Sequence, residues 1–407
     1  MRIAFISYEF PPDTGKGGIG TYVQQIATAL AANGFDIHVF AGSPCRTATK
    51  KNNGYTVHWV ECKDVADYRD KVLNSFTVQH QLVPFDCMES PEIGSNAWEI
   101  KKRFPQLRLI VRLHAPNFLV ESLKKSCIPF LMKLRFVLGA LRRLKWDLGY
   151  WKKYKKDEDT DYQFIKLADF ITAPSESMKK WVVDHWQINP AKIVLIPNIF
   201  LPSKAWLQIP INKEITYKRI VFFGRLNVLK GLVVSTKVMK RILQEFPDWK
   251  FRVIGDDGMG PHAGLSMKTW MQKELKPVIN QVEWMDGMSY EALPDAISPT
   301  EIVLLPSLFE SFSYTCSEAM ASGKAIIGSK NGGMADLLQQ EKSGLLINPL
   351  SYREIHAALK KLIVKNELRH QISINGRERV LTDFNADKTT QLYIGYYRSL
   401  VGVLKSD

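Results

Sequence analysis

The sequence predicts an α/β protein of two domains, each built on a doubly wound parallel sheet. Short β-branched or aromatic runs alternate with longer helical patterns along the chain, which is the pattern of βαβ units. The chain has 407 residues, which is more than one ordinary hydrophobic core accommodates. We therefore expect two sheets, each covered by helices on both faces.

The runs that fit the strands of the first sheet all lie before residue 200. Helical patterns fit between them, and the clearest covers residues 20–33, where apolar residues recur at helical spacing and Gly34 provides a stop. Residues 1–200 are therefore expected to form the first domain. Its strands are expected at residues 3–7, 37–41, 56–60, 85–88, 109–113, 170–173 and 193–196.

A break in this alternation separates the two halves. Residues 201–218 contain Pro202 and Pro210 and show no period, so they are expected to be a linker. The apolar run 219–223 then restarts the strand pattern, and the second domain is predicted to cover residues 219–387. Its further strands are expected at residues 250–254, 282–284, 302–305, 324–328 and 345–347.

The composition is typical of a soluble globular protein, with 45% hydrophobic and 24% charged residues. The five cysteines are scattered and show no metal-ligand spacing, so we expect reduced thiols. The first apolar run is too short for a signal-peptide core, and no run reaches the roughly 18 apolar residues of a membrane helix. These features predict a cytoplasmic protein.

The net charge of +14 is concentrated in one segment. Residues 122–156 hold eleven Lys or Arg residues and a single acid, Asp147, and their apolar residues recur at three- and four-residue spacing. A basic amphipathic helix of this kind fits an anionic membrane surface, and it equally fits a helix that packs on its own domain with solvated charges. Nucleic acid is not expected as a partner, because no binding motif accompanies the charge.

The most informative motif is a pair of glutamates, Glu310 and Glu318, at a strand-to-helix corner. An apolar strand ends at Pro306, a loop carries Glu310, and a helix that begins near Tyr314 carries Glu318. Such a corner lies at the carboxyl edge of an open sheet, where ligands bind. Free amides at a helix start attract phosphate, and carboxylates accept hydrogen bonds from sugar hydroxyls. The corner therefore suits a sugar nucleotide.

Cations stand at the first corner of the same domain. Gly224 and Arg225 follow a strand, and Lys230 stands at the next helix start. The planar fork of Arg and the point charge of Lys together match a pyrophosphate. Each alone would be an ordinary exposed cation, but their place in the domain that holds Glu310 and Glu318 favours a ligand.

Two further motifs belong to the first domain. Gly15, Gly17, Gly18 and Gly20 follow the first strand, where they fit either a close backbone approach to an anion or a tight turn; the dinucleotide spacing is absent. His114 ends an apolar run and is expected at a carboxyl strand end, although a lone histidine is more often structural. Three other residues fit ordinary turns as well as they fit a functional role, namely Asn198, Gly332 and Gly333.

With these motifs assembled, the chain resembles the family 4 retaining glycosyltransferases of the GT-B fold. The most specific element is Glu310 and Glu318 with seven residues between them, followed by the run from Ala319 to Gly323. The likeness extends over residues 1–397 and is weakest over 50–98 and 117–162. Its other elements are Gly224-Arg225-Leu226 with Lys230-Gly231, the Gly-Gly-Ile-Gly loop that ends at Gly20, and Ile196-Pro197-Asn198.

The resemblance implies a role for each matching residue. Arg225 and Lys230 are similar to the pair that neutralises the donor diphosphate and stabilises the leaving group. Glu318 is similar to the carboxylate that binds the ribose, Glu310 to the one that holds the donor sugar, and His114 to a histidine near the reacting centre. The expected catalytic residues are His114, Arg225, Lys230 and Glu310, and the expected donor-binding residues are Gly17, Gly18, Gly20, Gly224, Phe312, Ser313, Tyr314, Thr315 and Glu318.

The resemblance also implies two Rossmann-like domains that face a central cleft, with a last helix, 388–407, that crosses back onto the first domain. It implies retention of configuration at the anomeric carbon. The family commonly has glycine at the positions of Ser311 and Ser313, which leaves the donor-sugar preference open.

Together these features predict an enzyme that moves a sugar from a nucleotide-diphosphate sugar, UDP or GDP, to a saccharide or lipid-linked acceptor in polysaccharide or glycolipid assembly. It is expected in the cytoplasm, with contact to the inner face of the membrane left open. No cofactor or metal is expected, because Arg225 and Lys230 can take the place of a divalent cation. Two alternatives stay open: a sugar-nucleotide epimerase or hydrolase on the same fold, and a non-catalytic donor-binding protein.

Overall fold

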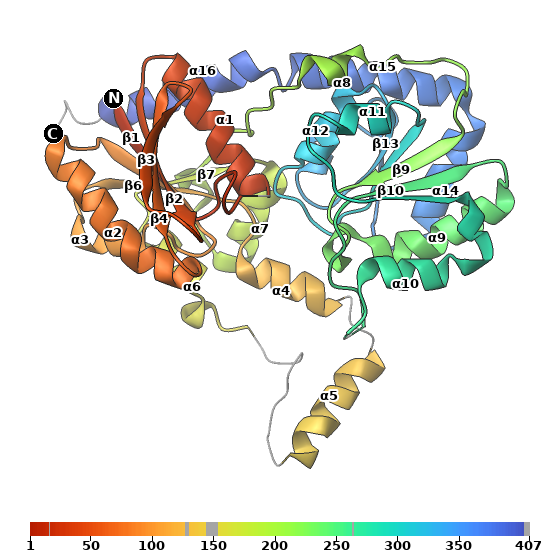
Figure 1. Ribbon diagram of the computed structural model, residues 1–407, viewed down its shortest axis with the longest axis horizontal. Helices are drawn as coiled ribbons and strands as arrows, with labels where there is room; N and C mark the ends of the chain where they lie inside the picture. Colours follow the sequence, from red (N-terminus) through yellow and green to blue (C-terminus); the bar gives the residue numbers. More distant parts are fainter. Residues whose placement is uncertain (16, 127–129, 144–153, 263, 403–407) are drawn as a thin grey trace. The chain divides into compact units, whose positions relative to one another are not determined.

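The computed structural model describes residues 1–15, 17–126, 130–143, 154–262 and 264–402. The chain divides into two compact units (Figure 1). The first comprises Met1–Asn117, Lys155–Leu201 and Phe384–Asp407, and the second comprises Phe118–Tyr154 and Pro202–Asp383. None of the described helices is long and apolar enough to cross a membrane.

The first unit contains a sheet with the strand order β3-β4-β2-β1-β5-β6-β7-β8. Its strands pair in parallel, apart from β3, which pairs antiparallel with β4 at the edge. The strands are β1 (Arg2–Ser7), β2 (Asp36–Ser43), β3 (Ala48–Asn52), β4 (Tyr55–Glu61), β5 (Cys87–Pro91), β6 (Arg108–Arg112), β7 (Phe170–Ala173) and β8 (Ile193–Leu195). The predicted parallel sheet is confirmed.

Helices cover both faces of this sheet, and α1 (Gly18–Ala32) and α2 (Val65–Leu82) lie on opposite faces (Figure 1). The strands between the two edges of the sheet are largely buried because both faces are covered, which is why they read as apolar runs. The other helices are α3 (Trp98–Arg103), α6 (Thr160–Ile165), α7 (Glu176–Trp186), the 3-10 turns η2 (Lys156–Glu158) and η3 (Pro190–Lys192), and α16 (Ala386–Gly402), whose Tyr393, Ile394, Tyr397 and Leu400 join the core.

The second unit contains a parallel sheet with the strand order β11-β10-β9-β12-β13-β14. The strands are β9 (Arg219–Phe223), β10 (Lys250–Ile254), β11 (Val282–Met285), β12 (Ile302–Leu305), β13 (Ala325–Ser329) and β14 (Leu345–Ile347). Its helices and 3-10 turns are α8 (Lys204–Gln208), η4 (Val228–Lys230), α9 (Leu232–Glu245), α10 (Met267–Glu274), η5 (Lys276–Gln281), α11 (Leu293–Ile297), α12 (Tyr314–Ala321), α13 (Met334–Leu337), α14 (Tyr352–Val364) and α15 (Asn366–Thr382). α8 lies within the segment expected to be an irregular linker.

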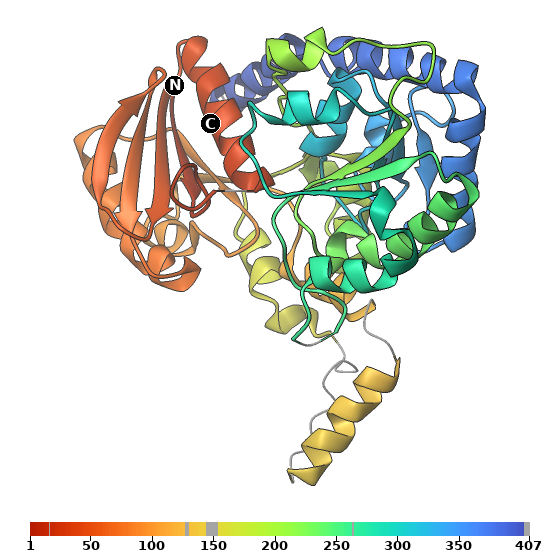
Figure 2. The same ribbon diagram turned by 45° about the vertical axis from the view of Figure 1, so that its right-hand side comes forward.

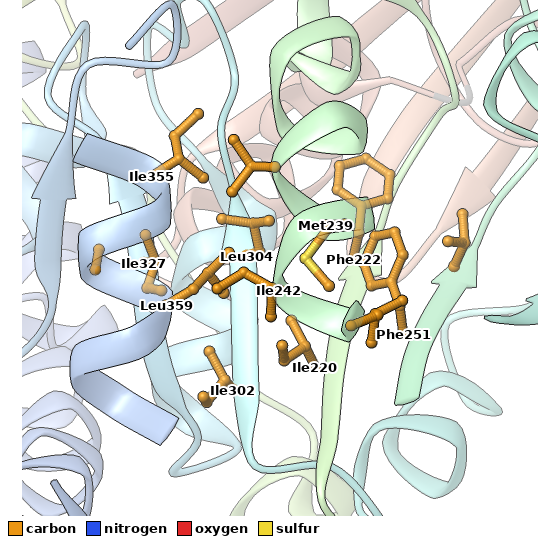
Figure 3. Packing of buried hydrophobic residues seen from close by; sticks show 14 of the residues in the cluster. Ile220, Phe222, Met239, Ile242, Phe251, Ile302, Leu304, Ile327, Ile355 and Leu359 are labelled. Atoms are coloured by element: carbon orange, nitrogen blue, oxygen red, sulfur yellow. The ribbon is translucent and has the colours of Figure 1, made fainter. Parts of the chain in front are cut away.

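The core of the second unit lies between this sheet and two of its helices. Figure 3 shows Met239 and Ile242 of α9 and Leu359 of α14 packed over Ile220 and Leu304 of the strands. Each of these side chains is at most 1% exposed. Burial of one such side chain contributes about 1.5–3 kcal/mol, so this layer holds the carboxyl ends of β9 and β12 in fixed positions.

α4 (Asn117–Ser126) and α5 (Phe130–Arg142) carry most of the described part of the basic segment (Figure 2). The predicted amphipathic segment also included residues 127–129 and 144–153, which lie outside the described residues. On α5 the side chains of Leu134, Phe136, Leu138 and Leu141 are 37–50% exposed. α5 therefore presents apolar side chains at its surface beside Arg135 and Arg142.

Candidate active site

In the second unit, the predicted site lies where the order of the strands reverses. β9 pairs with β10 on one side and with β12 on the other. The connections that leave β9 and β12 therefore run in opposite directions, and their loops diverge at the carboxyl edge of the sheet, where ligands of open α/β sheets bind. Lys230 follows β9, and Glu310 follows β12.

The side chains of Lys230 and Glu310 meet in an ion pair. The distance from Lys230 Nζ to Glu310 Oε1 is 2.5 Å, and the two side chains are 27% and 20% exposed. The structure thus brings together two residues that are 80 positions apart in the sequence. A charge-assisted hydrogen bond of this kind holds the ammonium of Lys230 and the carboxylate of Glu310 at the carboxyl edge of the sheet.

Two neighbours position Lys230. The side-chain Oδ1 of Asn227 accepts a hydrogen bond from the Lys230 amide at 3.2 Å, which caps η4. Gly231 has φ +69°, and a Cβ at this position would lie 1.8 Å from the carbonyl oxygen of Pro306. Only glycine therefore allows the loop after β9 to approach the loop after β12 so closely.

A pair of glycines, Gly332 and Gly333, holds the backbone of Glu310 in place. The amide of Gly333 donates to the carbonyl oxygen of Glu310 at 2.6 Å, and a Cβ on Gly332 would lie 2.2 Å from that oxygen. The sequence analysis found that both glycines fit ordinary turns equally well, and it did not predict this role. Asn227 was missed in the same way, although an Asn three residues before a helical Lys is a recognisable cap signal.

The start of α12 differs from the expected phosphate site in one detail. Ser313, at a position where the resemblance implies glycine, caps the helix by accepting a hydrogen bond from the Cys316 amide at 3.2 Å. Phe312 is buried, and the Thr315 amide has no hydrogen-bond acceptor among the described residues. The amides that precede Cys316 thus form the part of this helix start that can meet a phosphate.

Glu318 is half-buried on α12. Burial raises the pKa of its carboxyl to about 7, and the positive charge of Lys230 opposes that rise. Glu318 is therefore in the electrostatic range of Lys230, and its carboxylate titrates near neutral pH.

Arg225 is exposed in the loop after β9. It forms no hydrogen bond or ion pair with any other residue that the structure describes. The preceding Gly224 has φ +136°, and a Cβ on Gly255 would lie 2.0 Å from its carbonyl oxygen. The guanidinium of Arg225 is thus carried on a tightly packed turn and has no partner in the described part of the chain.

In the first unit, His114 follows β6 and is buried. Its backbone amide donates to both carboxylate oxygens of Glu92, at 2.9 and 2.8 Å, and its ring lies edge-on against Tyr22 at 5.3 Å. Burial, and then the charge of Arg112, lowers the pKa of His114 to about 3, so the ring is neutral. Within the described structure its Nε2 is buried without a hydrogen-bond partner.

A buried polar network lies beside His114. Glu89 on β5 accepts hydrogen bonds from Tyr22 at 2.6 Å and from Tyr397 of α16 at 2.5 Å. Arg112 on β6 donates to Asn198 Oδ1 at 2.6 Å. The sequence analysis named Asn198 as part of the family resemblance and found that it fits a turn equally well. It did not single out Glu89, Arg112 or Tyr397, whose partners lie far away in the sequence.

The glycine loop leads into α1. Gly17 is the N-cap residue of α1, and no side chain caps this helix start. A Cβ on Gly20 would lie 3.0 Å from Gly15 Cα, so the turn is tight. Gly17, Gly18 and Gly20 belong to the first unit with His114, whereas Lys230, Glu310 and Glu318 are brought together in the second unit.

Two family models match the chain one after the other. "Glycosyltransferase Family 4" matches residues 16–200, and "Glycosyl transferases group 1" matches residues 207–379. A D-inositol 3-phosphate glycosyltransferase of Corynebacterium glutamicum (strain R) is 23% identical, over 96% of this chain and 95% of its own. A glycogen synthase of Mycobacterium tuberculosis (strain ATCC 25618 / H37Rv) is 20% identical, over 98% and 95%.

Solved structures share the fold. Sucrose-phosphate synthase from Thermosynechococcus elongatus has a TM-score of 0.74 at 19% identity and covers 99% of both chains. Anabaena Alr3699/HepE in complex with UDP-glucose has a TM-score of 0.67 at 14% identity, over 98% of this chain and all of that one (100%). These likenesses confirm the predicted pair of α/β domains.

Proposed function

Because the chain belongs to the family 4 glycosyltransferases, we propose that it transfers a sugar from a nucleotide-diphosphate sugar onto a saccharide or lipid-linked acceptor. The observation that carries this proposal is the cluster of Lys230, Glu310 and Glu318 at the strand reversal of the second unit.

Lys230 changes partner when the donor binds. Its ammonium leaves the carboxylate of Glu310 and binds the diphosphate, and the planar guanidinium of Arg225 donates hydrogen bonds to the same diphosphate. The released carboxylate of Glu310 then accepts hydrogen bonds from hydroxyls of the donor sugar. As the bond from the sugar to the diphosphate breaks, both cations stabilise the charge that develops on the leaving group, which is an electrostatic form of catalysis without a metal ion.

Glu318 binds the ribose of the nucleotide. Two hydroxyls of the ribose donate hydrogen bonds to its ionised carboxylate, while the Thr315 amide and the start of α12 bind the phosphates. A UDP- or GDP-sugar is the expected donor. One structural neighbour, solved with UDP-glucose, supports the UDP choice.

His114 acts as a neutral hydrogen-bonding group. Its buried Nε2 forms a hydrogen bond with a hydroxyl of one of the substrates, and its low pKa keeps the ring uncharged at all working pH values. We propose retention by attack of the acceptor on the same face from which the diphosphate leaves. The acceptor hydroxyl then gives its proton to the departing phosphate oxygen.

Paired variants test the proposal. A thermal-shift screen of UDP-, GDP- and ADP-sugars first identifies the donor, since a bound ligand stabilises the fold. Glu310→Ala, and Arg225→Ala with Lys230→Ala, should each lower transfer from that donor by about 100-fold or more. Lys237→Ala, an exposed lysine on α9, is the matched control. Unchanged transfer in the cluster variants, or donor consumption without an acceptor, would contradict the proposal.

We also propose that the protein acts in the cytoplasm and binds peripherally to the inner face of the membrane through α5. Exposed Leu138 and Leu141 insert their apolar atoms while Arg135 and Arg142 face anionic headgroups. Co-sedimentation with phosphatidylglycerol vesicles should fall in a Leu138→Ser, Leu141→Ser variant. Equal pelleting of variant and wild type, or no pelleting at low salt, contradicts this placement.

A further inference from the structure

The ring of His114 lies against Tyr22 of α1, and Tyr22 is itself tied to α16. The two rings meet edge-on, with their centres 5.3 Å apart and an angle of 70° between their planes. Tyr22 Oη donates a hydrogen bond to Glu89 Oε1 at 2.6 Å, and Tyr397 Oη donates to Glu89 Oε2 at 2.5 Å. Each carboxylate oxygen of Glu89 thus accepts one phenol, and Glu89 joins α1 to α16.

The three groups of this contact are buried. Tyr22 and Glu89 are each 2% exposed, and Tyr397 is 0% exposed. Burial raises the pKa of Glu89, and the hydrogen bonds from the two phenols, followed by the charge of Arg112, oppose that rise. Because loss of one phenol leaves a buried carboxylate oxygen without that hydrogen bond, Glu89 and the other tyrosine must readjust. The two tyrosines are therefore coupled through Glu89.

Aromatic contacts tie Tyr22 to α16 a second time. The guanidinium carbon of Arg112 lies 4.8 Å from the centre of the Tyr22 ring and 5.8 Å from the centre of the Tyr393 ring. The rings of Tyr22 and Tyr393 are 6.3 Å apart. A cation that faces both rings holds them together, so the position of Tyr22 depends on how α16 packs.

The backbone of His114 is held separately from its ring. Glu92 accepts the His114 amide with both carboxylate oxygens, at 2.9 and 2.8 Å, but this contact leaves the side-chain torsions of His114 free. The ring Nε2 is buried without a hydrogen-bond partner among the described residues. The direction in which this nitrogen points therefore depends on packing against Tyr22. Tyr22, Glu89 and His114 also line a cavity of about 10 Å³, into which the Tyr22 ring can shift once its hydrogen bond is lost.

We propose that Tyr22 and Tyr397 are positioning residues for His114, coupled through Glu89, so that α16 determines how the histidine ring is oriented. The inference rests on the proposed glycosyl transfer and on the place of His114 in it. Because both tyrosines are buried, they act through His114 and not on a substrate. A displacement of about 1 Å at a reacting centre lowers a rate by about 100-fold, so a small shift of this ring is enough to be measured.

The ring resonances of His114 test the coupling without any activity assay. Proton–nitrogen correlation spectra of the full chain are recorded, and the His114 signals are identified by their loss in His114→Ala. Tyr22→Phe and Tyr397→Phe should both shift these signals. The matched control is Tyr68→Phe on α2, which removes a buried phenol bond of 2.7 Å to the Phe40 carbonyl and should leave the signals in place.

Transfer kinetics test whether the orientation of the ring matters to the reaction. Tyr22→Phe and Tyr397→Phe should each lower kcat by about tenfold or more while the donor KM changes by less than about twofold, because Lys230 and Glu310 stand in the second unit. In a His114→Ala background the same changes should lower kcat by less than about twofold, since no ring remains to be positioned.

Glu89→Gln is the milder variant, since its amide oxygen still accepts a phenol, and it should give smaller changes in the same direction. The positioning role is wrong if the His114 signals stay in place in both tyrosine variants, or if Tyr68→Phe lowers kcat as much as they do. It is equally wrong if their loss of kcat persists in the His114→Ala background, or if His114→Ala transfers like wild type.

The wild type separates this inference from the proposed function. Wild-type transfer that depends on Lys230, together with any of these contrary results, rejects the positioning role alone. Absence of transfer in the wild type rejects the proposed function and the positioning role with it.

Discussion

Substitution of Gly231 tests how closely the loops after β9 and β12 must approach each other. Gly231→Ala places a methyl group 1.8 Å from the Pro306 carbonyl oxygen, whereas real Cβ atoms essentially never come within 3.0 Å of another heavy atom. The two loops must therefore separate by more than 1 Å. Because Lys230 and Glu310 stand on these two loops, their ion pair opens as well.

The cost has two parts. The left-handed backbone, at φ +69°, costs an alanine about 1–2 kcal/mol, and the forced separation of packed backbone adds about 1–3 kcal/mol. The matched control is Gly264→Ala, because Gly264 has φ +76° and no atom within 4 Å of a Cβ. Gly264→Ala therefore has the cost of the left-handed backbone without the cost of separating packed backbone.

Scanning calorimetry and the donor thermal shift are the assays. Since 1 kcal/mol corresponds to about 2–4 °C in a unit of this size, Gly231→Ala should lower the melting temperature of the second unit by several degrees more than the control does. It should also reduce the donor shift, which the control should retain. Equal melting temperatures for the two variants, with an intact donor shift in both, would refute the reasoning.

Three further predictions follow from buried groups. Donor affinity should rise between pH 6 and 8 as Glu318 ionises near pH 7, and calorimetric titration of Glu318→Gln should show no such rise. Tyr397→Phe removes a 2.5 Å hydrogen bond to buried Glu89 and should cost about 1–3 kcal/mol in urea unfolding; a change within error would contradict the network. Burial lowers the pKa of His58 to about 4, so the folded state resists its protonation. Neutral His58 stabilises the folded state fully above pH 6.5, and the free energy of unfolding should fall by about 3 kcal/mol between pH 6.5 and 4 as the ring is protonated. The His58→Gln variant should not show this loss.

The strands were predictable where burial on both faces makes them apolar. The run 302–305 became β12, and the run 219–223 became β9. β3 was missed, because its residues Ala48–Asn52 are mostly polar and exposed and pair on one side only, so no apolar run marks an edge strand of this kind.

The candidate site was predictable where side-chain chemistry follows a strand end. Lys230 and Glu310 were both singled out, and the structure places them 2.5 Å apart. The role of the glycines that hold them was not predicted, because Gly332 and Gly231 act by letting backbones approach each other. Such an approach depends on the register of loops that are distant in sequence, and a single sequence carries no sign of it.

The central claim is that the donor diphosphate binds beside Arg225 and Lys230 with Glu318 on the ribose. Calorimetric titration of the donor nucleotide into the wild type, Arg225→Ala with Lys230→Ala, and the Lys237→Ala control measures it most directly. We predict that the double variant loses about 100-fold or more in affinity and that the control keeps the wild-type value. Affinity that is unchanged in the double variant would contradict the claim.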